Sequence, residues 1–137
     1  MTSFASWFCF PCIALALASP AAAQQSIVFP ATMVSVPITG TIAAATVIVT
    51  GQAGKSIYVT SVALVPVATS VVTFSQGTGA GCGSGTSNVT GAMTFAAGQT
   101  LTLGDGYGTV WVLAPGNSSC ITIATAATPG SLSYALF

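Results

Sequence analysis

The sequence predicts an all-β protein, an antiparallel β-sandwich with a jelly-roll-like arrangement of about eight or nine short strands. Short runs rich in Val, Ile, Thr and Tyr recur throughout residues 24–137, and each run is bounded by Gly, Pro, Asn or Ser. Runs of this kind are typical of strands separated by turns. No part of the region repeats its apolar residues with the period of a helix. The length of 137 residues suits one domain with a hydrophobic core and is too short for two.

The expected strands are residues 33–38, 46–50, 56–65, 71–75, 92–95, 100–103, 109–113, 120–125 and 131–137. Alternation in the last strands indicates which side chains share a face: Leu101 with Leu103, Ile121 with Ile123, and Leu132 with Tyr134 and Leu136, against Thr100, Thr102, Thr122, Ser133 and Ala135. Residues 46–49 (TVIV) and 110–113 (VWVL) do not alternate. They are either central strands covered on both faces or strands whose outer face meets another subunit. The uncharged composition favours the second interpretation.

Turn-forming dipeptides separate several of these runs. Asp-Gly at 105–106 is a strong turn signal, and Pro-Gly at 115–116 and at 129–130 is favoured at the centre of a type II turn. These three sites are therefore expected to be turns.

The segment GQAGKS at residues 51–56 ends like a phosphate-binding P-loop. The first glycine of that motif would fall on Val49, however, and the residues after Lys55 follow a strand pattern where a P-loop requires a helix. Residues 51–54 are therefore expected to form a hairpin turn, with Lys55 as a surface charge at a strand edge.

Only two side chains, Lys55 and Asp105, carry a formal charge, and the chain has no histidine. Nucleic acid is not expected as a partner, because neutralising its phosphates requires several Lys or Arg residues. Without histidine or a second carboxylate we expect no catalytic, cofactor-binding or metal-binding residues, and hence no enzyme and no cofactor. Asp105 suits a turn better than a Ca²⁺ site.

An uncharged surface does little to keep copies apart, so we expect the protein to work in a fixed assembly with itself and other assembly proteins.

Residues 1–23 have the pattern of a secretory signal peptide, with an apolar run at 8–18 and the small residues 21–23 before Gln24. The apolar run is too short to span a bilayer comfortably, so no stable membrane span is expected after cleavage. A retained hydrophobic N-terminal segment is the alternative. Cys9 and Cys12 have redox-motif spacing but lie inside this run, where they are not expected to act as a redox pair. Residues 24–137 then form the single domain, exported to the cell exterior or carried on a virion surface.

Cys82 and Cys120 are the two cysteines that remain, and an exported domain with two cysteines most simply joins them in a disulfide. The bond would close a loop of about 39 residues and contribute about 4 kcal/mol on the chain-entropy model. Cys82 lies within residues 74–91 (FSQGTGAGCGSGTSNVTG), which contain neither a dinucleotide-binding fingerprint nor a following helix pattern. This glycine-rich segment is expected to be a long connection between strands, tethered by the disulfide.

Short motifs in the C-terminal half are similar to those of a known group. They are CGSGT at 82–86, TGAM at 90–93, AGQTLTLGDG at 97–106, PGNSSC at 115–120 and GSLSY at 130–134. With both cysteines in place, this half resembles small β-sandwich proteins encoded by phages and prophages of proteobacteria. The resemblance implies a virion-associated structural protein of the surface or fibre-like kind, without enzymatic activity.

The sequence thus favours a non-enzymatic structural role on a phage virion, as a capsid decoration or a tail or fibre-like part, with capsid or tail proteins as further partners. The alternative is a bacterial secreted surface or matrix protein, a filament subunit or an adhesin. A small carbohydrate-binding module is a third possibility, in which Tyr107 and Trp111 would stack on sugars. The position of Trp111 within a strand favours a core role for that side chain.

Overall fold

The computed structural model describes residues 32–39, 44–105, 107–124 and 127–137. The expected signal peptide, with Cys9 and Cys12, lies outside these residues. Within the described part of the chain, no helix has the length and apolar character needed to cross a membrane.

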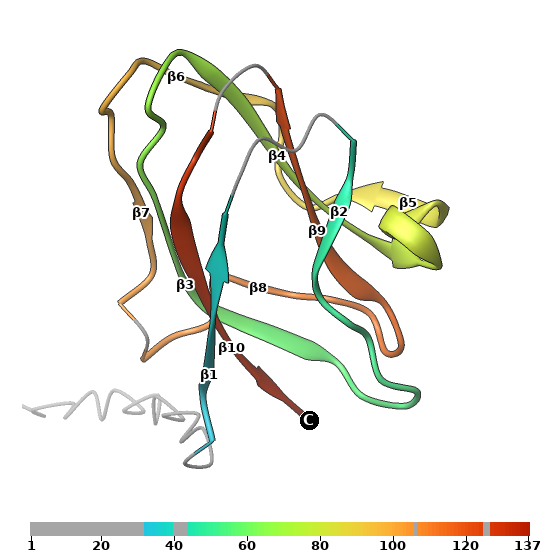
Figure 1. Ribbon diagram of the computed structural model, residues 1–137. Coiled ribbons are helices and arrows are strands. Elements are labelled where there is room, and N and C mark those ends of the chain that lie inside the picture. The colour runs from blue at the N-terminus through green and yellow to red at the C-terminus, as the bar shows by residue number, and fades with distance from the viewer. Residues whose placement is uncertain (1–31, 40–43, 106, 125–126) are drawn as a thin grey trace, which may run out of the picture.

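Ten strands and one short 3-10 helix make up the described fold. In chain order they are β1 (Val34–Ile38), β2 (Thr46–Val49), β3 (Ile57–Leu64), β4 (Ser70–Thr78), η1 (Ala80–Cys82), β5 (Ser84–Asn88), β6 (Met93–Phe95), β7 (Leu101–Leu103), β8 (Trp111–Val112), β9 (Ser118–Ala124) and β10 (Gly130–Leu136). Sheet A has the order β1-β10-β3-β7, with β8 also paired to β3, and sheet B has the order β2-β9-β4-β5, with β6 also paired to β4. The two sheets face each other (Figure 1).

Strand pairing follows a jelly-roll plan. Strand β1 pairs with β10, β2 with β9, β3 with β7 and β8, and β4 with β5 and β6, all antiparallel. The first four strands therefore pair with the last six in reverse order, as in one long hairpin. Because successive pairs of this hairpin fall alternately in sheets A and B, the hairpin is rolled into a sandwich. The expected antiparallel, jelly-roll-like β-sandwich is confirmed.

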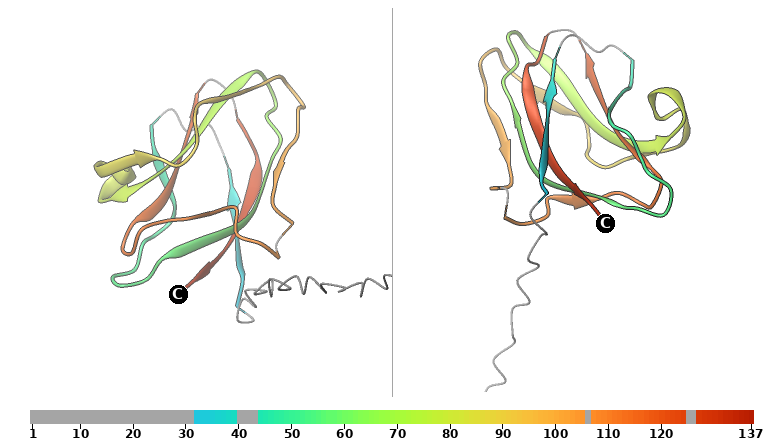
Figure 2. Two further views of the ribbon diagram at one scale, coloured as in Figure 1. Left: turned by 180° about the vertical axis from the view of Figure 1, so that it is seen from behind. Right: turned by 60° about the horizontal axis from the view of Figure 1, so that its bottom comes forward.

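The hydrophobic core fills the space between the sheets. Its largest fully buried side chains include Phe74 and Ile121 from sheet B and Ile57, Leu64 and Leu132 from sheet A. Views from behind and from below show the two layers curving around this space (Figure 2). Alternation places these side chains inward, since a strand directs successive residues to opposite faces.

Burial agrees with most of the expected alternation. Ile121, Ile123 and Leu132 are fully buried, while Thr122 and Ser133 are half-buried. Ala135 is the exception, because it is buried although it lies on the outer face of sheet A. Tyr58, its partner on β3, lies beside it on that face.

The strand predictions are correct in position, with three corrections. Strand β4 continues to Thr78, and residues 84–88 form β5, so the glycine-rich segment is a pair of strands joined by η1 and not one long connection. Strands β2 and β8 each pair with a single neighbour, so the interpretation of TVIV and VWVL as central strands is wrong. Residues 51–54 join β2 in sheet B to β3 in sheet A, which makes them a link between sheets and not a hairpin turn.

The two Pro-Gly sites behave differently. At 114–117 the Asn117 N–H donates to the Ala114 carbonyl (3.1 Å), and Gly116 has φ +81°, as a type II turn requires. This prediction is confirmed. The turn expected at 129–130 is wrong, because Gly130 is the first residue of β10 and pairs with Leu64. A Cβ on Gly130 would lie 2.2 Å from the Ala63 carbonyl oxygen, so the glycine is needed for close strand approach there.

Candidate functional site

The glycine-rich segment is held by the expected disulfide. Cys82 in η1 and Cys120 in β9 are bonded, with a Cα–Cα distance of 6.3 Å and a sequence separation of 38. Both cysteines are fully buried. The prediction of this bond is confirmed.

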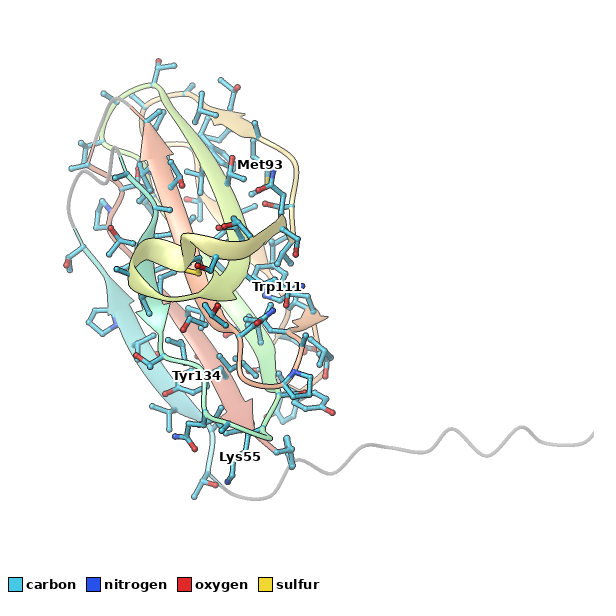
Figure 3. All side chains as sticks on the ribbon, turned by 90° about the vertical axis from the view of Figure 1, so that its right-hand side faces the viewer. Lys55, Met93, Trp111 and Tyr134 are labelled. Atoms are coloured by element: carbon cyan, nitrogen blue, oxygen red, sulfur yellow. A yellow bond between two sulfur atoms is a disulfide. The ribbon has the colours of Figure 1, made fainter. Side chains whose placement is uncertain are left out.

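The disulfide fixes η1 against the outer face of sheet B. Cys120 pairs with Val47 on one side and Ser75 on the other, and its chain neighbour Ile121 points into the core, so Cys120 projects outward. Cys120 and Ser75 are nevertheless buried, at 0% and 5% exposure. Figure 3 shows η1 and β5 lying across the strands of sheet B, with the sulfur atoms beneath them. The segment therefore shields part of this outer face from solvent.

Glycine is required where the segment crosses the sheet. A Cβ on Gly77 would lie 2.8 Å from the Cys82 carbonyl oxygen and 3.0 Å from that of Ser84. A Cβ on Gly81 would lie 2.5 Å from the Ala45 carbonyl oxygen, and Gly81 also has a left-handed φ of +58°. The glycines thus allow close backbone packing of η1 on sheet B and on the approach to β2. They do not form a cradle open to a phosphate.

Gln76 connects this segment to the turn at 114–117. Its Oε1 accepts a hydrogen bond from the Ala114 N–H (2.9 Å) and another from Asn117 Nδ2 (3.4 Å). Its Nε2 donates to Ser87 Oγ in β5 (3.1 Å). Sequence reasoning missed this role, because the partners are 11 to 41 residues away and no local pattern marks them.

The two charged side chains lie on separate connections. Asp105 follows β7, and its Oδ1 accepts a hydrogen bond from the Tyr107 N–H (3.0 Å). This bond lowers the pKa of the Asp105 carboxyl below its ordinary value. The geometry is that of an Asx turn, which agrees with the expected turn role. Lys55 lies in the connection between β2 and β3, and its backbone N–H donates to the Gln52 carbonyl (3.0 Å). A strand and not a helix follows it, so the P-loop remains excluded.

The two aromatic residues considered for sugar stacking lie in different environments. Trp111 packs on the core, with its ring centroid 5.1 Å from that of Phe74, so the expected core role is confirmed. Its Nε1 is buried and has no hydrogen-bond partner among the described residues. Tyr107 is 85% exposed, on the connection between β7 and β8.

Across the described residues, no three His, Cys, Asp or Glu side chains lie close enough to hold a metal ion. The site therefore consists of a surface segment, η1 and β5, that the disulfide holds against sheet B, next to surfaces that carry almost no charge. The chain matches no model of a protein family, no curated protein and no solved structure.

Proposed function

We propose that the protein is a non-enzymatic structural component of a phage virion surface, a capsid decoration or a tail or fibre-like part, which acts through protein–protein assembly. The observation that carries the proposal is the low charge of the protein's surface. Among the described residues, the exposed side chains of this jelly-roll sandwich include one lysine and one aspartate and no other charged group. Free proteins depend on surface charge to stay apart in solution, whereas a subunit with fixed neighbours does not.

Exposed apolar side chains support the same proposal. Val67 is 62% exposed, and Met33, Val34 and Val112 are between 46% and 49% exposed. Exposed apolar side chains scattered singly are common on monomers. On a described surface with only one lysine and one aspartate, they support a role in which other subunits cover part of that surface.

The disulfide favours an oxidising environment, since such bonds persist outside the cytosol. This observation suits a secreted matrix protein or filament subunit equally well. That alternative shares with the virion role the requirement for assembly, and the two differ in where the assembled protein is found.

Gold-labelled antibody against the purified protein separates the two roles by electron microscopy. Phage particles induced from the source cells and washed cells from the same culture are labelled side by side, with a strain lacking the gene as control. Label at regular positions on particles is the expected result. Label on cell-surface fibres, with particles unlabelled, would reject the virion role in favour of the secreted one.

A further inference from the structure

The segment that covers sheet B contributes nothing to the hydrophobic core. We call residues 79–88 the strap; it contains η1 and β5 and lies across the strands of sheet B (Figure 3). Cys82 is the one buried residue of the strap, and all residues of β5 are exposed. The core cluster, as far as the structure describes the chain, contains no strap residue. The core would therefore stay complete if the strap left the sheet.

The chain is anchored to the sandwich on both sides of the strap. Before it, β4 pairs with β9 as far as Gly77. After it, the N–H groups of Val89 and Thr90 both donate to the Phe74 carbonyl (2.9 and 3.2 Å), and the Phe74 N–H donates to Thr90 Oγ1 (3.0 Å). These hydrogen bonds do not involve the strap. An opening can therefore be confined to residues 79–88 and leave sheet B intact.

The strap has a backbone conformation that is unfavourable by itself. Gly79, Gly81 and Gly85 have positive φ angles of +75°, +58° and +62°. Cys82 has φ +57°, and among the described residues it is the one residue other than glycine with a positive φ. A residue with a Cβ is crowded by its own backbone in this region, so the conformation costs free energy at Cys82. A contact with another part of the chain has to hold Cys82 there.

The disulfide is the main contact of this kind. It joins Cys82 to Cys120 in β9. The strap is otherwise held by the pairing of β5 with β4, which includes a shift in register, and by two exposed hydrogen bonds from the β4 side chains Gln76 and Thr78 (3.1 and 3.3 Å). Exposed hydrogen bonds add little net stability, because water replaces them when they open. The covalent bond is therefore the principal restraint on the strap.

We propose that the strap is a redox-controlled cover, which lies closed on sheet B while the Cys82–Cys120 bond is intact and leaves the sheet when the bond is reduced, with the sandwich still folded. One thiolate of a dithiol reductant attacks a sulfur of the bond and forms a mixed disulfide, which the second thiolate of the reductant then breaks. The protein gains two electrons and two protons as two thiols, and the reductant becomes an intramolecular disulfide. Both cysteines are fully buried, so the attack requires the strap to lift first.

Reduction favours the open strap over unfolding of the whole domain. It removes the principal restraint on the strap and takes no side chain from the core. The released Cys82 can leave its unfavourable φ, and the strap regains conformational entropy. The open state uncovers Cys120 and Ser75, which are 0% and 5% exposed beneath the closed strap.

The cover responds to the compartment that contains the protein. The cytosol keeps thiols reduced, whereas disulfides persist outside it. We therefore expect an open strap in the cytosol and a closed one once the chain, free or on a particle, reaches an oxidising exterior. This inference goes beyond the proposed function and applies equally to the secreted role, so it can fail without affecting either.

Hydrogen–deuterium exchange read by mass spectrometry tests the cover on the purified protein, with and without dithiothreitol. Peptides that contain residues 79–88 should exchange roughly tenfold faster or more after reduction. Peptides from β3 and β10 should still be protected at labelling times when the strap has exchanged fully. The matched control is Cys82→Ala with Cys120→Ala, whose strap should exchange rapidly whether or not dithiothreitol is present. Strap exchange that reduction leaves unchanged would overturn the proposal, and so would loss of protection in β3 and β10 as early as in the strap.

A second measurement detects the uncovered face through the reactivity of one thiol. In Cys82→Ala the strap has no bond to β9, so Cys120 should react with a maleimide within about tenfold of its rate in the urea-unfolded chain. The modified Cys120 peptide is followed by mass spectrometry, and circular dichroism shows that the variant is folded during the reaction. A Cys120 thiol that reacts more slowly than this in the folded variant would mean that the strap stays closed without its bond, which contradicts the proposed cover.

Discussion

Replacing both cysteines, Cys82→Ala with Cys120→Ala, tests how much the disulfide stabilises the fold. The bond spans a separation of 38 residues. On the chain-entropy model a loop of this length contributes about 4 kcal/mol at 25 °C. The double variant removes both thiols, so no unpaired reactive cysteine remains among the described residues.

The expected loss can be read as a shift in melting temperature. For a domain of roughly 110 residues, 1 kcal/mol corresponds to about 4 °C, so the double variant should melt about 15 °C lower than the wild type. Loss of the η1 contacts with sheet B would add to this shift, because the bond holds η1 over the buried Ser75. Thermal unfolding followed by circular dichroism measures it.

Reduction of the wild type provides the matched control. Dithiothreitol should lower the melting temperature of the wild-type protein by a similar amount and leave the double variant unchanged. If the double variant melts within about 3 °C of the wild type, the bond does not constrain the unfolded chain as argued, and the structural role given to the glycine-rich segment is wrong.

Three further predictions concern single positions. Gly77→Ala should destabilise the fold by about 1–3 kcal/mol, because the new Cβ meets backbone oxygens of residues 82 and 84; Gly91→Ala, with open space around it, should stay within about 0.5 kcal/mol of the wild type in urea unfolding. Gln76→Ala should cost about 1 kcal/mol through its lost hydrogen bonds, whereas the exposed Gln52→Ala should be neutral in the same assay. The lowered pKa of Asp105 means that its contribution to stability is present above its unfolded pKa of about 3.9 and is lost as the pH falls through the lower folded value. Asp105→Asn should therefore remove part of the acid-induced drop in melting temperature, and an unchanged acid limb would contradict the assigned hydrogen bond.

The strands and the disulfide were predictable because their signals are local or few. Alternation identified Ile121, Ile123 and Leu132 as core residues, since a half-buried strand has to place apolar side chains on one face. With Cys9 and Cys12 expected to lie in a signal peptide, Cys82 and Cys120 were the two cysteines left to pair. The type II turn at 114–117 was predictable because Pro and Gly each suit one of its positions.

Other features depend on contacts between distant parts of the chain. Strand β5 has the sequence SGTSN and is exposed throughout, so no apolar pattern marks it, and its pairing with β4 arises from backbone hydrogen bonds. Residues 51–54 have the composition of a tight turn, and that composition does not tell a hairpin from a link between two sheets.

The measurement that tests the central claim most directly is the copy number of this chain in purified phage particles, determined by quantitative mass spectrometry. A structural virion component should be present at a fixed ratio to the major capsid or tail protein, and the ratio should survive repeated density-gradient purification. A ratio that falls with each purification step, while the chain accumulates in the medium or on cells, would contradict a structural role on the virion.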